Sequence, residues 1–400
     1  MPRHRGTTRK RGAWCAAAAA AAAVAATASS AAAAAAASSA AAAAAVSPSC
    51  MMNGDPCPLP AGWAVDWSLS NSTIAMPEAG GAGVNGSGFW PADGHHWGAV
   101  SLDWQVGEQT WLNASDRMRS TCEATSAANC ARLKAAGVVR RCGIYHNVEL
   151  ALQWIESARA VMYDETKKDW FLQYTDGRGN KNGTIYNEPR VEGDQYFIDY
   201  RNMDAAAYFV ASIVNATVAL GADLTFTDDR DGIPVEHPQL PALLNLSDAE
   251  VAQAQFATQA AGQWLATSLA AAGKTCWDCL GGYELGPRPV QGASCATTMR
   301  SLCDVAGQGR SMLMGYSGNP PGELNQSLAA FLVTRPPVAF FGSRWQDSGW
   351  TPLFDMDVGE PLGLCAEGPP GVFSREWSRG TAALDCNAWT ASLPFALMKR

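Results

Sequence analysis

The chain has 400 residues, a net charge of −8 and 48% hydrophobic residues. This length and apolar content are sufficient for a folded domain with a sizeable buried core. The sequence contains no basic stripe outside its first residues, which excludes nucleic acid as an expected partner.

The N-terminal stretch has the composition of a leader segment. Residues 1–12 are basic and contain no acid, and residues 16–46 are almost entirely alanine. A basic start, an apolar run and small residues are typical of a secretory signal peptide, although this run is about twice the usual length. We therefore expect residues 1–46 to be a signal peptide, with a membrane anchor, a transit peptide and a low-complexity tail as alternatives. A membrane partner is expected only if the segment is retained as an anchor.

Sequons and cysteines predict a secreted or lumenal glycoprotein. Seven Asn-X-Ser/Thr sequons begin at Asn71, Asn85, Asn113, Asn182, Asn215, Asn245 and Asn325. The twelve cysteines suit an oxidising compartment. Candidate local disulfides are Cys122/Cys130, Cys295/Cys303 and Cys365/Cys386, although connectivity cannot be read from a sequence. The CxxC pair Cys276/Cys279 ends a predicted strand rather than opening a helix, so we do not expect redox catalysis.

Apolar runs that predict β-strands recur along the rest of the chain. They lie at 99–104, 141–146, 196–199, 222–227, 274–279, 311–316, 338–342 and 371–374, and a further short strand is expected at 63–69. Helical patterns lie among them at 127–136, 148–160, 203–220, 248–272 and 326–333. Strands alternating with helices predict an α/β fold with a single (β/α)8 TIM barrel over residues 95–400, after a loop-rich extension at 47–94. A doubly wound sheet is the alternative, but its Gly-rich phosphate turn is absent.

Two of the predicted strands end in carboxylates. The first ends at Asp199 and the second at Asp228 and Asp229, and a predicted helix lies between them. A strand–helix–strand unit places its two strands parallel and close together. We therefore expect Asp199 to lie within about 10 Å of Asp228 or Asp229 at one barrel mouth, as adjacent-strand spacing requires. The alternative for a single aspartate at a strand end is a turn-forming role.

Residues from about 70 to 395 resemble a group of eukaryotic secreted proteins with a predicted glycosidase-like TIM barrel. The likeness is carried by short segments at 99–104, 143–154, 196–202, 224–229 and 371–384. His146 stands where that group has an arginine. The resemblance implies a TIM barrel of the hypothetical glycoside hydrolase class and a carbohydrate substrate.

Paired carboxylates at one barrel mouth suit glycoside hydrolysis, in which one acid protonates the leaving oxygen and another acts as nucleophile or base. The catalytic candidates are Asp199, Asp228, Asp229 and Glu236. The candidates for substrate binding are Asp103, Trp104, His146, Arg201, Arg230 and Trp345. Arg201 and Arg230 either orient the acids or form structural salt bridges, and His146 is either a ligand for a sugar hydroxyl or a core histidine.

We expect no cofactor and no metal. The acidic run at 228–231 offers oxygen ligands for Ca²⁺ as an alternative, but its spacing does not match an EF-hand loop. The competing function is a non-catalytic carbohydrate-binding barrel at the cell surface. The sequence does not indicate the sugar, the linkage, the stereochemical course or the oligomeric state.

Overall fold

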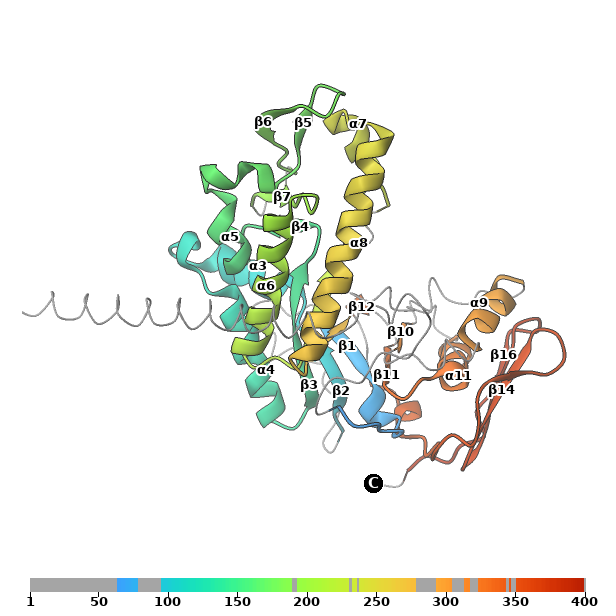
Figure 1. The fold of residues 1–400 in the computed structure, drawn as a ribbon. Helices are drawn as coiled ribbons and strands as arrows, with labels where there is room; N and C mark the ends of the chain where they lie inside the picture. The colour runs from blue at the N-terminus through green and yellow to red at the C-terminus, as the bar shows by residue number, and fades with distance from the viewer. Residues whose placement is uncertain are drawn as a thin grey trace, which may run out of the picture. The chain divides into compact units, whose positions relative to one another are not determined.

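A computed structural model describes residues 63–77, 95–188, 193–229, 232–235, 237–277, 293–303, 313–316, 323–342, 345–346 and 350–398 (Figure 1). All of them belong to one unit, Val46–Arg400. The predicted leader lies outside the described residues, so the predicted boundaries at 46 and 94 stay predictions. Among the helices within these ranges, none combines the length and apolar character needed to cross a bilayer.

The fold is mixed α/β and is built on parallel strands. The parallel strands are β1 (Ile74–Pro77), β2 (Trp97–Ser101), β3 (Val139–Asn147), β8 (Leu224–Asp228), β9 (Thr275–Trp277), β10 (Leu313–Tyr316), β11 (Ala339–Gly342) and β12 (Trp345–Gln346). One sheet has the order β12-β1-β2-β3-β8-β9, and β10 and β11 form a second parallel pair. A bridge between Thr73 and Phe341 connects the two.

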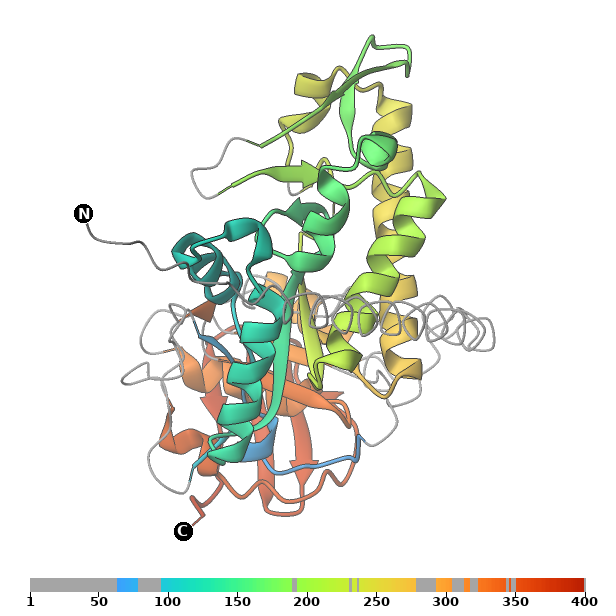
Figure 2. The same ribbon diagram turned by 90° about the vertical axis from the view of Figure 1, so that its left-hand side faces the viewer.

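Helices lie between most of these strands. They are α3 (Trp104–Asn113), α4 (Cys122–Ala135), α5 (Glu156–Met162), α6 (Met203–Ala219), α7 (Leu240–Leu244), α8 (Asp248–Ala271), α9 (Ala293–Cys303) and α11 (Leu324–Thr334), with 3-10 turns at η1 (Ser70–Ser72), η3 (Arg117–Arg119), η4 (Glu165–Trp170) and η5 (Pro352–Asp355). The long helices α6 and α8 run beside each other in both views (Figure 2). As expected of Ser-x-x-Glu, Ser247 and Glu250 form a capping box at the start of α8.

The strand–helix–strand unit around α6 differs from the prediction. β3 pairs directly with β8, from Gly143 opposite Leu224 to Asn147 opposite Asp228. The run that ends at Asp199 contains only the short strand β7 (Gln195–Phe197), which pairs antiparallel with β4 (Leu150–Leu152). Residues 148–202 are therefore an excursion from the end of β3, which also holds the β5–β6 hairpin (Gln173–Thr175 and Lys181–Ile185). The expectation that Asp199 and Asp228 end neighbouring strands is wrong.

Other expectations are corrected in the same way. The run at 371–374 begins β14 (Val372–Trp377), which belongs to an antiparallel sheet with β13 (Ala366–Glu367), β15 (Gly380–Asp385) and β16 (Thr390–Ser392). Tight turns join β14, β15 and β16, so each pairs with its chain neighbour and not with the parallel sheet. Residues 150–152 form β4 instead of a helix, and 63–69 is not a strand. The described residues thus show a parallel α/β sheet without a closed eight-stranded barrel.

The disulfides whose two cysteines are both described connect different elements. They join Cys130 to Cys142, Cys295 to Cys386 and Cys303 to Cys365, and Cys122 is buried and free. The three predicted local pairs are therefore wrong. In α4 and α9 the predicted partners lie eight residues apart on one helix, where the geometry of a disulfide cannot be met.

Candidate active site at the ends of β3 and β8

The candidate site lies where β3 and β8 end side by side. Their parallel register places Asn147 opposite Asp228. Polar residues that follow two such strands leave the sheet at the same edge, and this edge carries the ligand sites of parallel α/β proteins. The pairing of β3 with β8 therefore brings the polar residues after β3 and those after β8 together. The strand β7 does not contribute to this arrangement.

Two hydrogen bonds join the strand ends through side chains. The Tyr145 hydroxyl donates to Oδ2 of Asp228 at 2.9 Å, and Nδ2 of Asn147 donates to Oδ2 of Asp229 at 2.6 Å. Burial, together with the charges of Asp228 and Asp229, raises the pKa of Tyr145 well above its ordinary value. Tyr145 therefore keeps its proton and serves as a hydrogen-bond donor throughout the neutral range.

Asn147 also fixes the turn that leaves β3. Its Oδ1 accepts hydrogen bonds from the backbone N–H of Glu149 at 2.8 Å and of Leu150 at 2.6 Å. The turn positions the Glu149 side chain, which is only 3% exposed. One asparagine thus connects the backbone that carries Glu149 to the side chain of Asp229.

A histidine from the loop after β8 completes the cluster. Nε2 of His237 lies 3.6 Å from Oε2 of Glu149 and 3.9 Å from Oδ2 of Asp229. Its ring packs edge-on against Phe197, with centroids 4.8 Å apart. We call Tyr145, Asn147, Glu149, Asp228, Asp229 and His237 the strand-end cluster.

The backbone of Asp229 is unusual and explains how two consecutive carboxylates face one cluster. Successive residues of a strand point to opposite sides. Asp229 has a φ of 55°, in the left-handed region that non-glycine residues rarely occupy. The chain therefore turns at Asp229, and both Asp228 and Asp229 reach residues at the end of β3. Such outliers are frequent at functional sites.

Asp199 lies in a different network. Its carboxylate is 2% exposed and binds Arg201 through Nε at 2.7 Å and Nη2 at 2.9 Å, while Nζ of Lys181 lies 2.9 Å away. Burial alone would raise the pKa of Asp199, but Arg201 and Lys181 outweigh it and hold the pKa below its ordinary value. Asp199 therefore stays ionised and cannot donate a proton at neutral pH.

His146 points away from the strand-end cluster. Its Nε2 lies 2.9 Å from Oε1 of Glu123 and its Nδ1 lies 3.0 Å from Oγ1 of Thr225. Tyr145 and Asn147 on either side of it face the cluster, so the alternation of strand side chains places His146 on the opposite face. The sequence leaves open whether His146 binds a sugar hydroxyl or is a core histidine, and this geometry is that of a core histidine.

The remaining predicted residues have structural contacts or lie outside the described residues. Asp103 is 1% exposed and caps α3, with Oδ1 accepting from the backbone N–H of Trp104 at 2.7 Å. The Trp104 ring packs near Trp154, with centroids 6.1 Å apart. Outside the described residues are Arg230, Glu236 and the side chain of Trp345.

The sequence did not indicate four residues of the strand-end cluster. Tyr145 and Asn147 stood in the predicted strand and directly after it, where an asparagine after an apolar run is a usable signal. Glu149 lies within residues 148–160, where the sequence pattern predicts a helix, so no sequence signal marks it. No local pattern marks His237, which reaches the cluster through the fold of its loop.

Comparisons with known proteins identify no family. No family model matches the sequence, and no curated protein is similar to it. The chain is similar to solved structures of Ega3 from Aspergillus fumigatus in complex with galactosamine (11% identity, 76% of this chain, 86% of that chain, TM-score 0.33), an α-amylase from Geobacillus thermoleovorans in complex with acarbose (10%, 80%, 87%, 0.36) and a cyclic α-maltosyl-(1→6)-maltose hydrolase from Arthrobacter globiformis (12%, 80%, 92%, 0.39). At such low TM-scores and identities, the functional argument rests on the residues of this chain.

Proposed function

We propose that the chain is a secreted hydrolase of glycosidic bonds whose active site is the strand-end cluster. The observation that carries the proposal is the convergence of Asp228, Asp229 and Glu149 at the ends of β3 and β8. Glycoside hydrolysis needs one carboxylate as nucleophile or base and one carboxylic acid as proton donor. The cluster supplies both kinds of group, and no cofactor is required.

Asp228 is the proposed nucleophile or base. The hydrogen bond from the Tyr145 hydroxyl favours its ionised form, because a donor stabilises a carboxylate. A carboxylate held in its ionised form can accept a proton or attack the substrate without first losing a proton. Asp229, fixed by Asn147, is the proposed ligand for sugar hydroxyls.

Glu149 is the proposed proton donor. It is buried, and it shares one imidazole, that of His237, with the carboxylate of Asp229. The leaving glycosidic oxygen needs a proton, which Asp199 cannot supply.

The wider fold and location are part of the same proposal. The parallel strands run in the order β9-β8-β3-β2-β1, β1 is followed by β12 and, through the Thr73–Phe341 bridge, by β11, and β11 pairs with β10; a pairing of β9 with β10 would close them into a TIM-like barrel. The three disulfides between described cysteines support an oxidising compartment. Glu236, Arg230 and Trp345 stay proposed catalytic and substrate-binding residues, and Arg201 is proposed to position Asp199.

The test is hydrolysis by the purified protein of a panel of aryl glycosides and polysaccharides, followed by release of aglycone or reducing ends. We expect Asp228→Asn and Glu149→Gln each to lower turnover by on the order of a hundredfold or more. Asp248→Asn, at an exposed carboxylate in the first turn of α8, is the matched control.

Two results would contradict the proposal. Wild-type turnover in both Asp228→Asn and Glu149→Gln would remove the strand-end cluster from the chemistry. A wild-type protein that binds a glycan of the panel but hydrolyses none would favour the carbohydrate-binding alternative instead.

A further inference from the structure

The described sequons fall into two groups, according to whether the Ser or Thr that each requires is exposed or buried. A usable N-glycosylation acceptor lies in an accessible surface segment. The Ser or Thr of the sequon is exposed at three sites and buried at three. The exposed hydroxyl residues are Ser115, Thr184 and Ser247, and the buried ones are Thr73, Thr217 and Ser327.

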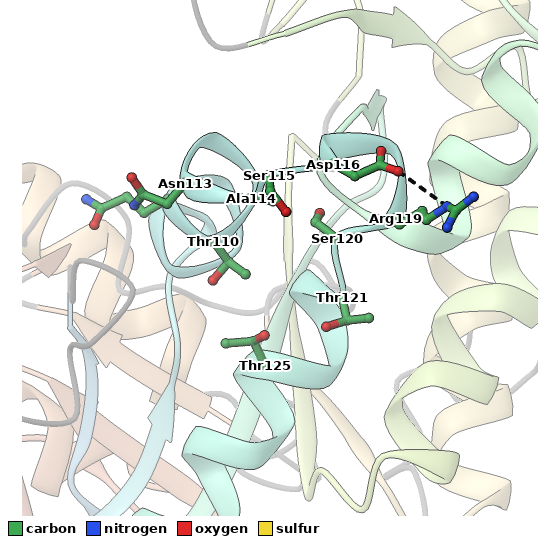
Figure 3. A pocket seen from close by; sticks show the side chains of 10 residues that line it. Thr110, Asn113, Ala114, Ser115, Asp116, Arg119, Ser120, Thr121 and Thr125 are labelled. Carbon is green, nitrogen blue, oxygen red and sulfur yellow. Dashed lines mark ion pairs between the residues drawn. The ribbon is translucent and has the colours of Figure 1, made fainter. Parts of the chain in front are cut away.

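The sequon at Asn113 is open, which means that its amide nitrogen and its hydroxyl residue are both accessible; a sequon that lacks either is called closed. It is the last residue of α3, and Ala114 after it is extended, with φ −70° and ψ 136°. Asn113 and Ser115 are both exposed and border a hollow of about 930 Å³ between α3 and α4 (Figure 3). Thr121 and Thr125 also line this hollow. The segment therefore offers an accessible amide nitrogen with space for a sugar beside it.

Asn182 is open as well. It lies on β6, where the side chains from Lys181 to Thr184 are exposed. Its Oδ1 accepts from the backbone N–H of Thr184 at 2.8 Å, an Asx turn that engages the oxygen and leaves the nitrogen for attachment. Apart from Gly183 and its two chain neighbours, no described residue has an atom within 4 Å of the position that a Cβ on Gly183 would take, so the surface here is uncrowded.

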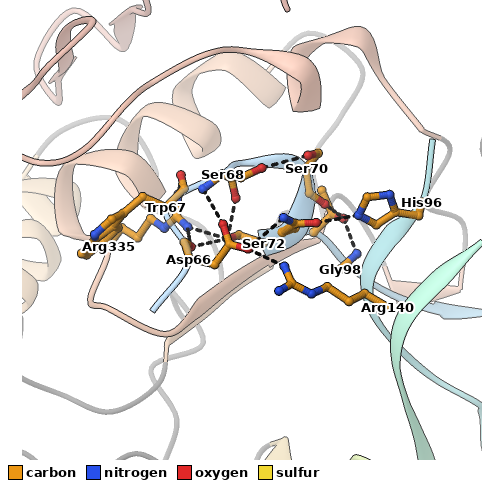
Figure 4. Close-up of polar contacts among 11 residues, drawn as sticks. Asp66, Trp67, Ser68, Ser70, Ser72, His96, Gly98, Arg140 and Arg335 are labelled. Carbon is orange, nitrogen blue, oxygen red and sulfur yellow. Dashed lines mark hydrogen bonds and ion pairs between the residues drawn. The ribbon is translucent and has the colours of Figure 1, made fainter. Parts of the chain in front are cut away.

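Asn71 is closed, because both polar atoms of its side chain are engaged. Nδ2 donates to Oδ2 of Asp66 at 2.8 Å, and Oδ1 lies 2.6 Å from Nε2 of His96. Asp66 also forms an ion pair with Arg140 (Figure 4). A pyranose on Nδ2 would have to enter this group of charges.

The other described sequons are closed for different reasons. Asn245 has an exposed serine, but its Nδ2 points at the carbonyl oxygen of Thr175 at 3.4 Å. Thr217, the hydroxyl residue for Asn215, is fully buried within α6 and donates to the carbonyl oxygen of Ile213 at 2.8 Å. Ser327, which follows Asn325 on α11, is 3% exposed.

We propose that Asn113 and Asn182 are the N-glycosylation sites of the described chain, and that Asn71, Asn215, Asn245 and Asn325 stay unmodified in the folded protein. A glycan attached before folding would have to displace the hydrogen bonds that Nδ2 makes at Asn71 and Asn245. At Asn215 and Asn325, the folded chain buries the hydroxyl residue of the sequon. The proposal is independent of the catalytic one and concerns a different surface. It makes no statement about Asn85, which lies outside the described residues.

The test is site mapping on the full chain, secreted with its own N-terminal segment from a eukaryotic host. Peptides are released by protease, and glycans are removed enzymatically in heavy-oxygen water, which marks every modified asparagine as labelled aspartate in the mass spectrum. We expect the label at Asn113 and Asn182. The double variant Asn113→Gln/Asn182→Gln should lose two glycans on a gel and keep the thermal midpoint of the wild type, because both side chains are exposed.

The wild-type map alone decides the proposal, whether or not the variant folds. Label at Asn71, Asn215, Asn245 or Asn325 would overturn the assignment of closed sites. Absence of label from Asn113 or Asn182, including a chain that carries no glycan at all, would overturn the assignment of open sites.

Discussion

The Tyr145 hydroxyl donates a 2.9 Å hydrogen bond to Oδ2 of Asp228 across the pair formed by β3 and β8. Both residues lie at the ends of their strands, so the bond joins the two segments that the proposed chemistry needs together. Hydrogen bonds to charged groups contribute about 1.5–3 kcal/mol. This contact is therefore large enough to be measured by substitution.

We expect Tyr145→Phe to lower kcat/KM by about 10- to 100-fold, which is that range of free energy converted at about 1.4 kcal/mol per tenfold. Loss of a donor to the ionised carboxylate also moves the acidic limb of the pH–rate profile to higher pH. The control is Tyr163→Phe, which removes the hydrogen bond from a partly exposed tyrosine to Asp194 at 2.8 Å. Equal profiles for the two variants would exclude a role for Tyr145.

The second prediction concerns Asn147, which joins the backbone at Glu149 to the side chain of Asp229. Asn147→Leu keeps the shape but leaves the backbone N–H groups of Glu149 and Leu150 without their acceptor. Each unsatisfied buried group costs about 1–3 kcal/mol. We expect a lower free energy of unfolding in urea, and a fall in kcat that exceeds any change in KM, because the proposed proton donor is displaced.

Asn187 offers a matched control for Asn147. Its Nδ2 donates to Asp194 at 2.7 Å and its Oδ1 accepts from the backbone N–H of Gln195 at 3.0 Å, but the side chain is exposed. Asn187→Leu should leave kcat unchanged. If Asn147→Leu loses stability but keeps wild-type kcat, Asn147 is a structural residue only.

The third prediction separates Asp199 from the proposed chemistry. Asp199→Asn leaves Arg201 and Lys181 without a carboxylate. Because these two cations are partly exposed, we expect the free energy of unfolding to fall by about 1–3 kcal/mol at neutral pH. The pKa of Asp199 is lowered in the folded state, so its contribution is present at neutral pH and is lost as the pH falls through that lowered pKa. Urea unfolding at several acidic pH values should show the difference from the wild type disappearing.

Kinetics supply the other half of this prediction. Well below its unfolding midpoint, Asp199→Asn should keep turnover within a few-fold of the wild type, unlike Asp228→Asn. A loss of turnover comparable to that of Asp228→Asn, without a change in stability, would return Asp199 to the active site.

The strands and helices were predictable where one local pattern was sufficient. β2, β3 and β8 are buried apolar runs, and α8 begins at Ser247 with its capping box. Pairing was not predictable, because a short run such as β7 satisfies its hydrogen bonds equally well in an antiparallel pair with β4. β1 was missed because its four residues lie in a stretch rich in Gly and Asn.

The candidate site was predictable only in part for the same reason. Asp228 and Asp229 follow a buried strand, and a parallel sheet exposes such residues at its functional edge. Glu149 and His237 reach that edge through an irregular turn and a loop, whose paths depend on tertiary contacts such as that of His237 with Phe197. A carboxylate after a short apolar run, as at Asp199, looks the same in sequence whether it is catalytic or paired with Arg201.

Glu123 and Glu156 cap each other's helices. Oε2 of Glu156 accepts from the backbone N–H of Glu123 at 2.8 Å, and Oε2 of Glu123 accepts from the backbone N–H of Ser157 at 2.9 Å. Burial, together with the charge of Glu123, raises the pKa of Glu156 from 4.5 to about 7. Burial also acts on Glu123, but His146 and Ser157 outweigh it and lower its pKa. The two carboxyls therefore titrate in different pH ranges.

The last prediction follows from the sign of these shifts. The folded chain binds the Glu156 proton more tightly than the unfolded chain, so this group stabilises the fold below pH 4.5, and its contribution is lost as the pH rises to about 7. Glu123 acts in the opposite sense, and its contribution is lost only at lower pH. Glu156→Gln keeps an oxygen acceptor for the Glu123 N–H and removes the titration. We therefore expect the thermal midpoint of the wild type to fall, relative to that of Glu156→Gln, between about pH 5 and about pH 8.

Glu165→Gln, at an 80% exposed acid in η4, is the control and should follow the wild type. Parallel midpoint curves for the wild type and Glu156→Gln would show that Glu156 does not titrate in this range.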